Sequence, residues 1–338
     1  MSEAVPTLTK KDFATDQEVR WCPGCGDYAI LSATQQVFPL LGVPREKFVI
    51  VSGIGCASRF PYYMNVYGFH TIHGRAPAVA TGVKVTNPEL SVWIVSGDGD
   101  ALSIGGNHII HLMRRNVDVK LLLFDNRIYG LTKGQASPTS ERGKRTKSTP
   151  FGSVDRPFDP VALALGAGAT FIARSIDVHT THLKDTLTAA HAHHGTAFVQ
   201  IYQNCNIFND GAFDAFREKA VREDGTVALR HGEPLVFGAA ADRGIRLNAA
   251  HQPEVVRLGD GVSEKDLVVH DEGGSLGYLA MLAEMAPPRL PVPIGVLRRV
   301  ELPTFEDGVH AQIAGVIGDK GPGNLAKALR AGQTWDVT

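Results

Sequence analysis

A Gly-Asp-Gly-Asp turn between two apolar runs constrains the fold of this chain more than any other feature. The first run, residues 91–96, is predicted to be a buried strand, and it passes directly into the turn at residues 97–100. Residues 101–115 have the length and apolar content of a helix. The second run, residues 119–125, is followed at once by Asn126. Strand, helix and strand in this order predict a parallel βαβ unit whose two strands end at the same sheet edge.

The same alternation extends over the first 210 residues. Strand-like runs separated by helical stretches lie near residues 48–52, 91–96, 119–125, 170–174 and 197–202. We therefore expect an α/β fold, with a mostly parallel sheet and helices on both faces. No Pro-, Gly- or Ser-rich linker divides this part, so residues 1–210 are predicted to be one domain. Residues 211–338 are less regular and are predicted to be a C-terminal extension, with helical candidates at 275–285 and 324–331.

The turn at residues 97–100 has the features of a diphosphate and metal site. Gly97 and Gly99 let the backbone approach a ligand, and the helix that follows directs free N–H groups at an anion. Asp98 is then placed to hold a cation that bridges this anion, and Asn126 is expected at the same edge. Carboxylate, amide and carbonyl oxygens, the last near Ile128, are ligands that Mg²⁺ prefers. The sequence therefore predicts a magnesium–diphosphate site.

The chain has only four cysteines, and their positions indicate a second site. Cys22 and Cys25 lie in a tight Cys-Pro-Gly-Cys turn, whereas Cys56 and Cys205 each follow a strand-like run. Four thiolates suit zinc or an iron–sulfur cluster. Zinc ribbons usually pair two Cys-x-x-Cys turns, so the isolated third and fourth cysteines favour iron–sulfur. A redox Cys-x-x-Cys pair with two inert buried thiols is the alternative. Disulfides are not expected, because no secretory signal opens the chain.

These motifs together resemble a known family. Gly-Asp-Gly followed after about 30 residues by Asn resembles the thiamine diphosphate motif. WCPGCG, GIGC, HTIHGRA and YGLTKGQASPT are similar to the β subunit of 2-oxoacid:ferredoxin oxidoreductases. The resemblance runs from about Trp21 to Asp210 and implies the thiamine diphosphate-binding fold for residues 1–210.

The resemblance also implies a set of site residues. One [4Fe-4S] cluster would be held by Cys22, Cys25, Cys56 and Cys205, and Mg²⁺ by Asp98, Asn126 and the carbonyl of Ile128. Thiamine diphosphate would be bound by Ile54, Gly55, Cys56, Ala57, His73, Gly99, Asp100, Gly130 and Leu131. Cys56 belongs to both sets, so the two cofactors are expected to be neighbours.

The resemblance implies oxidative decarboxylation of a 2-oxoacid. Coenzyme A would take the acyl group, and electrons would pass through the cluster to ferredoxin. The run from Gly55 to Tyr63 resembles the 2-oxoglutarate branch, and pyruvate and branched or aromatic 2-oxoacids are the other substrates considered. The alternatives are a non-redox thiamine diphosphate decarboxylase or synthase with structural zinc, and a non-catalytic electron-transfer subunit. Iron content and cofactor binding would separate these alternatives.

A partner subunit is expected for two reasons. Thiamine enzymes generally activate the cofactor with a carboxylate from a second domain, and this chain is expected to contain only one such domain. The chain also has no ferredoxin-like run of cysteines. We therefore expect an α subunit, or a fused γ–α subunit, at the active site. The extension at residues 211–338 is expected to pack on that subunit.

Two residues are candidates for direct catalytic roles. Arg59, three residues after Cys56, is expected to bind the substrate carboxylate, with a solvated loop residue as the alternative. His73 is assigned to catalysis and cofactor binding through its motif. By contrast, the histidines at 191, 193 and 194 are expected to form a solvated helix end. The basic stretch 133–150 is expected to be a long loop, for which a solvated surface position is favoured and contact with the cofactor or with the phosphates of coenzyme A is the functional alternative.

The charge and hydropathy of the chain exclude other classes of partner. The net charge is −1, so neither nucleic acid nor an anionic membrane is an expected partner. No apolar run approaches the roughly 20 residues of a membrane-spanning helix. We expect a soluble, cytoplasmic protein.

Overall fold

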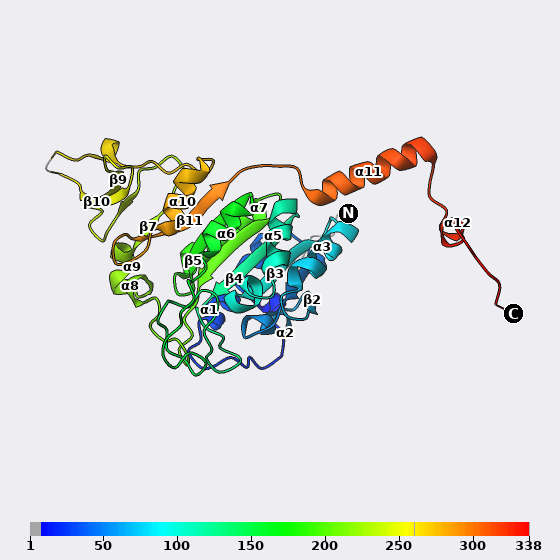
Figure 1. Cartoon of the computed structure of the whole chain (residues 1–338), viewed down its shortest axis with the longest axis horizontal. Coiled ribbons are helices and arrows are strands. Elements are labelled where there is room, and N and C mark those ends of the chain that lie inside the picture. The colour runs from blue at the N-terminus through cyan, green and yellow to red at the C-terminus, as the bar shows by residue number, and fades with distance from the viewer. Residues whose placement is uncertain (1–7, 260, 338) are drawn as a thin grey trace.

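The computed structural model describes residues 8–259 and 261–337, and its centre is an 8-stranded sheet (Figure 1). The order of strands across the sheet is β2-β1-β3-β4-β6-β5-β11-β7. The strands are β1 Phe48–Ser52, β2 Tyr67–His70, β3 Ser91–Gly97, β4 Val119–Asp125, β5 Phe171–Ile176, β6 Ala197–Tyr202, β7 Thr226–Ala228 and β11 Val292–Arg299. Neighbours pair in parallel except β11, which runs antiparallel to β5. The predicted mostly parallel α/β sheet is confirmed.

Helices cover both faces of the sheet because its strands are apolar on both faces. In β3, Val92 and Ile94 pack into one apolar layer, and Trp93 and Val95 into the other. The first layer is covered by α3 Ala76–Thr86, α5 Gly106–Arg115, α6 Pro160–Gly166 and α10 Leu276–Glu284. The second is covered by α1 Asp27–Val37 and α7 Thr180–Ala192, with α2 Phe60–Tyr63 beside them.

The helix predicted at residues 101–115 is two helices, α4 Asp98–Leu102 and α5. The chain turns at Ser103, whose φ and ψ are −95° and −107°. Gly105 then packs so closely that a Cβ atom there would lie 2.6 Å from the carbonyl oxygen of Asp100. The glycines at this point therefore end one helix and begin another. As a result, the Gly-Asp-Gly-Asp segment forms its own short helix at the sheet edge.

Residues after 210 complete the sheet. Helices α8 Asp214–Arg217 and α9 Lys219–Gly225 lead into β7, and β11 returns to pair with β5. Between them, β8 Val236–Phe237, β9 Arg243–Leu247 and β10 Pro253–Arg257 form a small antiparallel sheet. The main sheet thus takes strands from both sides of residue 210. The predicted role of residues 211–338, as an extension that packs on a partner subunit, remains a proposal.

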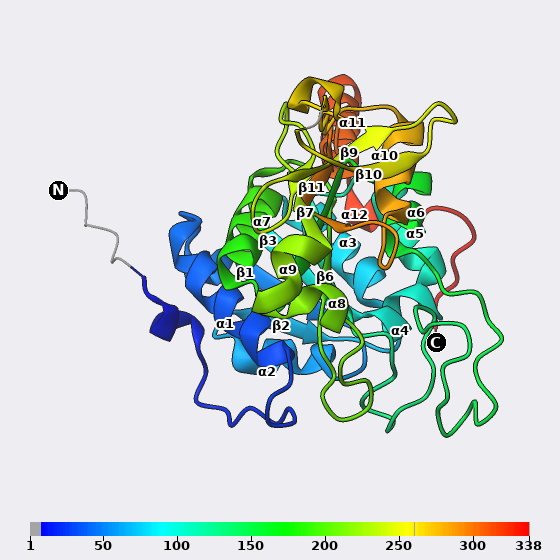
Figure 2. The same ribbon diagram turned by 90° about the vertical axis from the view of Figure 1, so that its left-hand side faces the viewer.

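The C-terminal segment leaves the body of the molecule as an arm (Figure 1), which lies behind the body in the view of Figure 2. Helix α11 Phe305–Lys320 contacts the body at its start, where Glu306 accepts a hydrogen bond from the N–H of Asp118. Residues 311–337, which include α12 Leu325–Leu329, are exposed. No helix among the described residues has both the length and the apolar character to cross a membrane.

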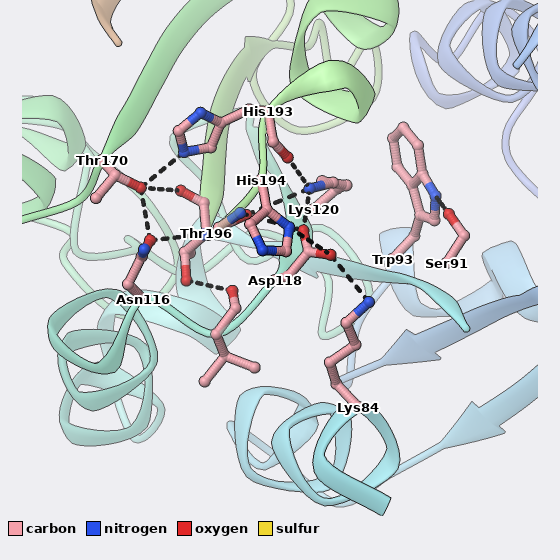
Figure 3. Close-up of polar contacts among 12 residues, drawn as sticks. Lys84, Ser91, Trp93, Asn116, Asp118, Lys120, Thr170, His193, His194 and Thr196 are labelled. Carbon is pink, nitrogen blue, oxygen red and sulfur yellow. Dashed lines mark hydrogen bonds and ion pairs between the residues drawn. The ribbon is translucent and has the colours of Figure 1, made fainter. Parts of the chain in front are cut away.

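At the amino edge of the sheet, a polar network joins β4 to α3 and α7 (Figure 3). The carboxylate of Asp118 lies 2.6 Å from Lys120 Nζ and 2.9 Å from Lys84 Nζ. Burial alone would raise the pKa of Asp118, but the two ammonium groups hold its pKa well below the usual value. His193 is buried here, with Nε2 2.8 Å from Thr170 Oγ1, so its predicted solvated position is wrong.

Candidate functional site

The loops that follow β1, β3, β4 and β6 meet at the carboxyl edge of the sheet. The register pairs Gly97 with Phe124 and Asp125 with Tyr202, so the residues after each of these strands become neighbours. Asp98 and Asn126 therefore lie together, as the spacing of the motif predicts. This edge contains two adjoining cavities.

The first cavity, of about 110 Å³, lies over the Gly-Asp-Gly-Asp helix. Every residue predicted to bind the diphosphate cofactor or its metal lines it: Ile54, Gly55, Cys56, Ala57, His73, Asp98, Gly99, Asp100, Asn126, Ile128, Gly130 and Leu131. Tyr129 and Thr132 line it too. The structure thus brings together residues from four loops, while their individual roles remain proposals.

The geometry around Asp98 suits a cation. Its Oδ2 lies 2.5 Å from Ser137 Oγ and 2.6 Å from Thr139 Oγ1. Burial, together with the nearby charge of Asp125, raises the pKa of Asp98. The two buried carboxylates share one hydrogen-bond donor, Thr139 Oγ1, and repel each other when both are charged. A bound cation would relieve this repulsion. The donor set of Asp98, the Asn126 amide and the Ile128 carbonyl therefore fits Mg²⁺.

Asp100 organises the loops around the cavity. Its Oδ1 accepts hydrogen bonds from the N–H groups of Ile54 and Gly74, at 3.1 and 2.8 Å, and its Oδ2 accepts one from Ser96. His73 Nδ1 lies 2.7 Å from the same Oδ1, although its ring N–H does not point along this contact. The pair is therefore an electrostatic contact and not a well-formed hydrogen bond.

Glycines allow the backbone to approach a ligand at this cavity. A Cβ atom on Gly99 would lie 2.2 Å from the ring of Tyr129, whose hydroxyl donates to the Gly99 carbonyl at 3.0 Å. Gly55 has φ +127°, which L side chains rarely adopt. Side chains at these positions would either fill the space or strain the loop, so the shape of the cavity depends on glycine.

The second cavity, of about 180 Å³, is lined by all four cysteines. All four are free thiols. A Cβ atom on Gly130 would lie 3.6 Å from both Cys56 Sγ and Cys205 Sγ, so these sulfurs face one point. Burial, as the main cause, raises the pKa of Cys56 to about 12.

The four cysteines line this one cavity. Among the described residues, no group of three or more His, Cys, Asp or Glu side chains is close enough together to hold a metal ion. A cluster holds its thiolates at separate corners, whereas zinc draws four ligands to one centre. Four free thiols that line one cavity are a donor set that fits an iron–sulfur cluster, and the choice of this group over zinc remains a proposal.

The two cavities share a wall. Both are lined by Asp27, Cys56, Asn126, Gly130 and Leu131. Asp27, which sequence reasoning missed, is buried at the start of α1. Burial, with a smaller contribution from the charge of Asp177, raises the pKa of Asp27 to about 7. Its position directly after the cysteine turn is the only sequence signal that could have identified it.

Arg59 lies on the cysteine side of this wall. It lines the second cavity and not the first, and its Nη1 donates to the carbonyl of Arg20 at 2.8 Å. A substrate in the first cavity would therefore have to extend past the shared wall to reach Arg59. Its assignment to the substrate carboxylate remains a proposal.

The predicted long loop between β4 and α6 contributes to the first cavity. Residues 126–159 contain no helix or longer strand, and the loop brings Ser137 and Thr139 against Asp98. Sequence reasoning missed these two hydroxyls, because nothing in their spacing relates them to residue 98. The loop thus fixes the orientation of the candidate metal ligand.

Comparisons with known proteins agree with this site. Residues 53–201 match the family described as thiamine pyrophosphate enzyme, C-terminal TPP binding domain. This span contains every lining residue of the first cavity except Asp27, whereas Cys22, Cys25 and Cys205 lie outside it.

Two of the three similar proteins described next match almost the whole chain, and the third matches a little more than half of it. The 2-oxoglutarate oxidoreductase subunit KorB of Mycobacterium tuberculosis is 50% identical over 98% of this chain and 91% of its own length. The β subunit of 2-oxoacid:ferredoxin oxidoreductase 1 of Aeropyrum pernix is 50% identical over 59% of this chain and 62% of its own length. Among solved structures, a 2-oxoglutarate:ferredoxin oxidoreductase from Magnetococcus marinus, with 2-oxoglutarate, coenzyme A and succinyl-CoA bound, has a TM-score of 0.76. It is 31% identical, and the match covers 97% of each chain.

Proposed function

The chain belongs to the β subunits of the 2-oxoacid:ferredoxin oxidoreductases, and from this membership we propose that it acts on 2-oxoglutarate with coenzyme A. The products would be succinyl-CoA and carbon dioxide, and the electrons would pass to ferredoxin. Support for 2-oxoglutarate comes from the names of the M. tuberculosis relative and of the M. marinus structure. The membership itself makes the chain a subunit of an enzyme complex.

We further propose how the site residues divide between cofactors. The domain binds thiamine diphosphate, which would occupy the first cavity, with Mg²⁺ held by Asp98, Asn126 and the Ile128 carbonyl. The four cysteines would hold one [4Fe-4S] cluster in the second cavity. When bound, thiamine diphosphate supplies the electron sink that decarboxylation of a 2-oxoacid needs. The chain's own residues position this cofactor and exclude water from it.

Specific contributions follow from the geometry of these residues. Asp100 holds the loops that carry Ile54 and Gly74 in place, and its contact holds His73 at the cavity. Gly99 and Tyr129 set the shape of the floor. Arg59 would provide positive charge beside the cluster cavity and bind the substrate carboxylate across the shared wall.

The observation that carries this proposal is the wall common to both cavities. Cys56 lines both cavities, so a cluster held by the four cysteines would lie directly beside the thiamine diphosphate site and would serve there as the electron acceptor. A thiamine enzyme without redox chemistry has no need for this arrangement. The α subunit is the expected partner, and residues 211–338, with the exposed arm, are proposed to pack on it. A cytoplasmic location is part of the same proposal.

The decisive experiment is metal and sulfide analysis of the anaerobically purified heteromer, followed by its visible spectrum. About four irons per β chain, and bleaching on addition of 2-oxoglutarate and coenzyme A, are expected. Bleaching with pyruvate but not with 2-oxoglutarate would overturn the substrate assignment. Zinc in place of iron, with no spectral response, would instead indicate a non-redox thiamine enzyme.

A further inference from the structure

Gln203 contacts residues of both candidate cofactor sites. It is completely buried directly after β6. Its Oε1 accepts a hydrogen bond from Asn126 Nδ2 at 2.8 Å. Its Nε2 donates to the Asn204 carbonyl at 2.7 Å and to Cys25 Sγ at 3.3 Å. One side-chain amide thus lies between a candidate metal ligand and a candidate cluster ligand.

The fold places Gln203 there for identifiable reasons. Tyr202 pairs with Asp125, so the next residues, Gln203 and Asn126, emerge side by side from neighbouring parallel strands. The N–H of Gln203 extends this pairing by donating to the Asp125 carbonyl at 2.9 Å. Gly26 allows the cysteine turn to come close, because a Cβ atom there would lie 3.0 Å from Gln203 Cγ.

The orientation of the amide is fixed by its partners. Oε1 faces the NH₂ group of Asn126, and the two hydrogens on Nε2 face a carbonyl oxygen and a sulfur. If the amide were flipped, its NH₂ group would face that of Asn126 and its oxygen would face the Asn204 carbonyl, leaving both pairs unsatisfied. Such a buried mismatch costs about 1–3 kcal/mol for each unpaired group. The N–H therefore points at the sulfur in the resting fold.

We propose that Gln203 is a positioning residue that orients Asn126 and, through its N–H bond to Cys25, raises the reduction potential of the cluster. This rests on the proposed function, because it requires both cofactors. Hydrogen bonds to cluster sulfurs favour the reduced, more negative state, and so raise its potential. The same amide binds Nδ2 of Asn126 and so fixes the orientation of that side chain, whose Oδ1 accepts one hydrogen bond from the N–H of Ile128, at 3.1 Å, and has a second lone pair for a metal.

The test compares three variants of the anaerobic heteromer by potentiometric titration monitored by EPR. Gln203→Glu keeps an acceptor for Asn126 but loses the donor to Cys25. Gln203→Leu loses both contacts without adding charge. Asn206→Asp makes the same amide-to-carboxylate change in the same cavity, at a residue whose Nδ2 bonds to the Pro23 carbonyl and not to a sulfur.

Both Gln203 variants are expected to bind iron normally and to have a lower potential. The one-electron reduction equilibrium should change by up to about tenfold, or about 59 mV. Asn206→Asp should change the reduction potential of the cluster by less than Gln203→Glu does. Magnesium-dependent affinity for thiamine diphosphate should fall in Gln203→Leu and be retained in Gln203→Glu.

Two results would overturn the inference. One is a wild-type potential in both Gln203 variants with iron bound, and the other is an equal shift in Gln203→Glu and Asn206→Asp with none in Gln203→Leu. The second result would mean that added negative charge alone, and not the lost hydrogen bond to Cys25, changes the potential. Absence of iron from the wild-type heteromer is a different result, because it would reject the proposed function itself.

Discussion

At the scale of single residues, Asp98 lowers the stability of the metal-free fold at a position that suits a cation. Asp98 is buried beside a second buried carboxylate, Asp125, and its pKa is raised for that reason. A carboxyl group with a raised pKa in the folded state binds more protons there than in the unfolded state. The metal-free fold therefore loses stability as the pH rises above the usual pKa of 3.8.

Asp98→Asn should stabilise the metal-free chain at neutral pH by roughly 1–3 kcal/mol, because it removes a buried charge and the repulsion between that charge and Asp125. The gain should vanish below about pH 4, where the carboxyl is protonated in both states. The same variant should lose at least about tenfold in magnesium-dependent affinity for thiamine diphosphate. Thermal unfolding across pH and calorimetric titration of the cofactor measure the two effects. Normal cofactor affinity would remove Asp98 from the metal site.

Gly99→Ala should weaken cofactor binding by about tenfold or more without unfolding the chain. The added methyl group would lie 2.2 Å from the Tyr129 ring, which must then move into the first cavity or away from it. Gly82→Ala is the matched control, since no heavy atom lies within 4 Å of the new methyl group in helix α3. The control should bind the cofactor normally and gain about 0.5–1 kcal/mol of stability. Equal affinities for both variants would argue against a tight floor at Gly99.

Residues in contiguous motifs were predictable, and those defined by packing were not. The glycines and Asp98 stand at fixed spacing in one βαβ unit, so the sequence locates them. Gln203 and Thr139 reach the site only through contacts with Asn126 and Asp98, and no local pattern encodes such contacts. Asp27 follows a recognisable turn but belongs to a helix, where an acidic first residue is ordinary.

At the scale of elements, the amino edge of the sheet depends on one carboxylate, Asp118. It compensates the buried charge of Lys120 and bonds to Lys84, which lies in α3. Asp118→Asn should therefore cost about 3–5 kcal/mol at neutral pH, because it leaves a buried ammonium group without its counter-charge.

The pH dependence of that cost has a definite sign. The pKa of Asp118 is depressed in the folded state, so its stabilisation is complete above the usual value of 3.8 and is lost as the pH falls below it. The stability difference between wild type and variant should shrink over that range in urea unfolding. Asp307→Asn, at an exposed carboxylate paired with His194, should change stability by less than about 1 kcal/mol. A difference that grows in acid would contradict this account.

Buried strands were easier to predict than the helices. The five predicted strands are mainly apolar, and the structure places each within two residues of its expected range. The helix expected at 101–115 is divided at Ser103, because Gly105 permits a close turn that a helical pattern does not reveal. Helix α11 was missed, since its apolar residues are mixed with glycine and alanine all round. Strand β11 was missed because it lies in the part expected to be irregular.

At the scale of the whole molecule, the exposed arm is a feature that a single chain does not explain. Truncation after His310 should leave the stability of the isolated chain unchanged, because residues 311–337 are exposed. It should abolish stable association with the α subunit, measured by co-purification and size-exclusion chromatography.

Point variants test whether the exposed apolar surface of α11, and not only the presence of the helix, is needed for association with the α subunit. Ile313 and Ile317 are 50% and 47% exposed and lie one turn apart on the same face. Replacing both with Asp should weaken association as truncation does, whereas Ala311→Asp, on the opposite face, should not. An intact heteromer with the truncated chain would place the α subunit elsewhere.

The composition of the cysteine cavity also constrains the order of events during synthesis. Its sulfurs come from the N-terminal turn, the loop after β1 and the loop after β6, so the cavity does not exist until residue 205 has been translated and folded. Strand β5, the neighbour of β6, pairs on its other side with β11, which is made almost a hundred residues later still. A nascent chain therefore exposes reactive thiols long before it can shelter them. Any machinery that delivers a group to all four sulfurs must act on a nearly finished protein.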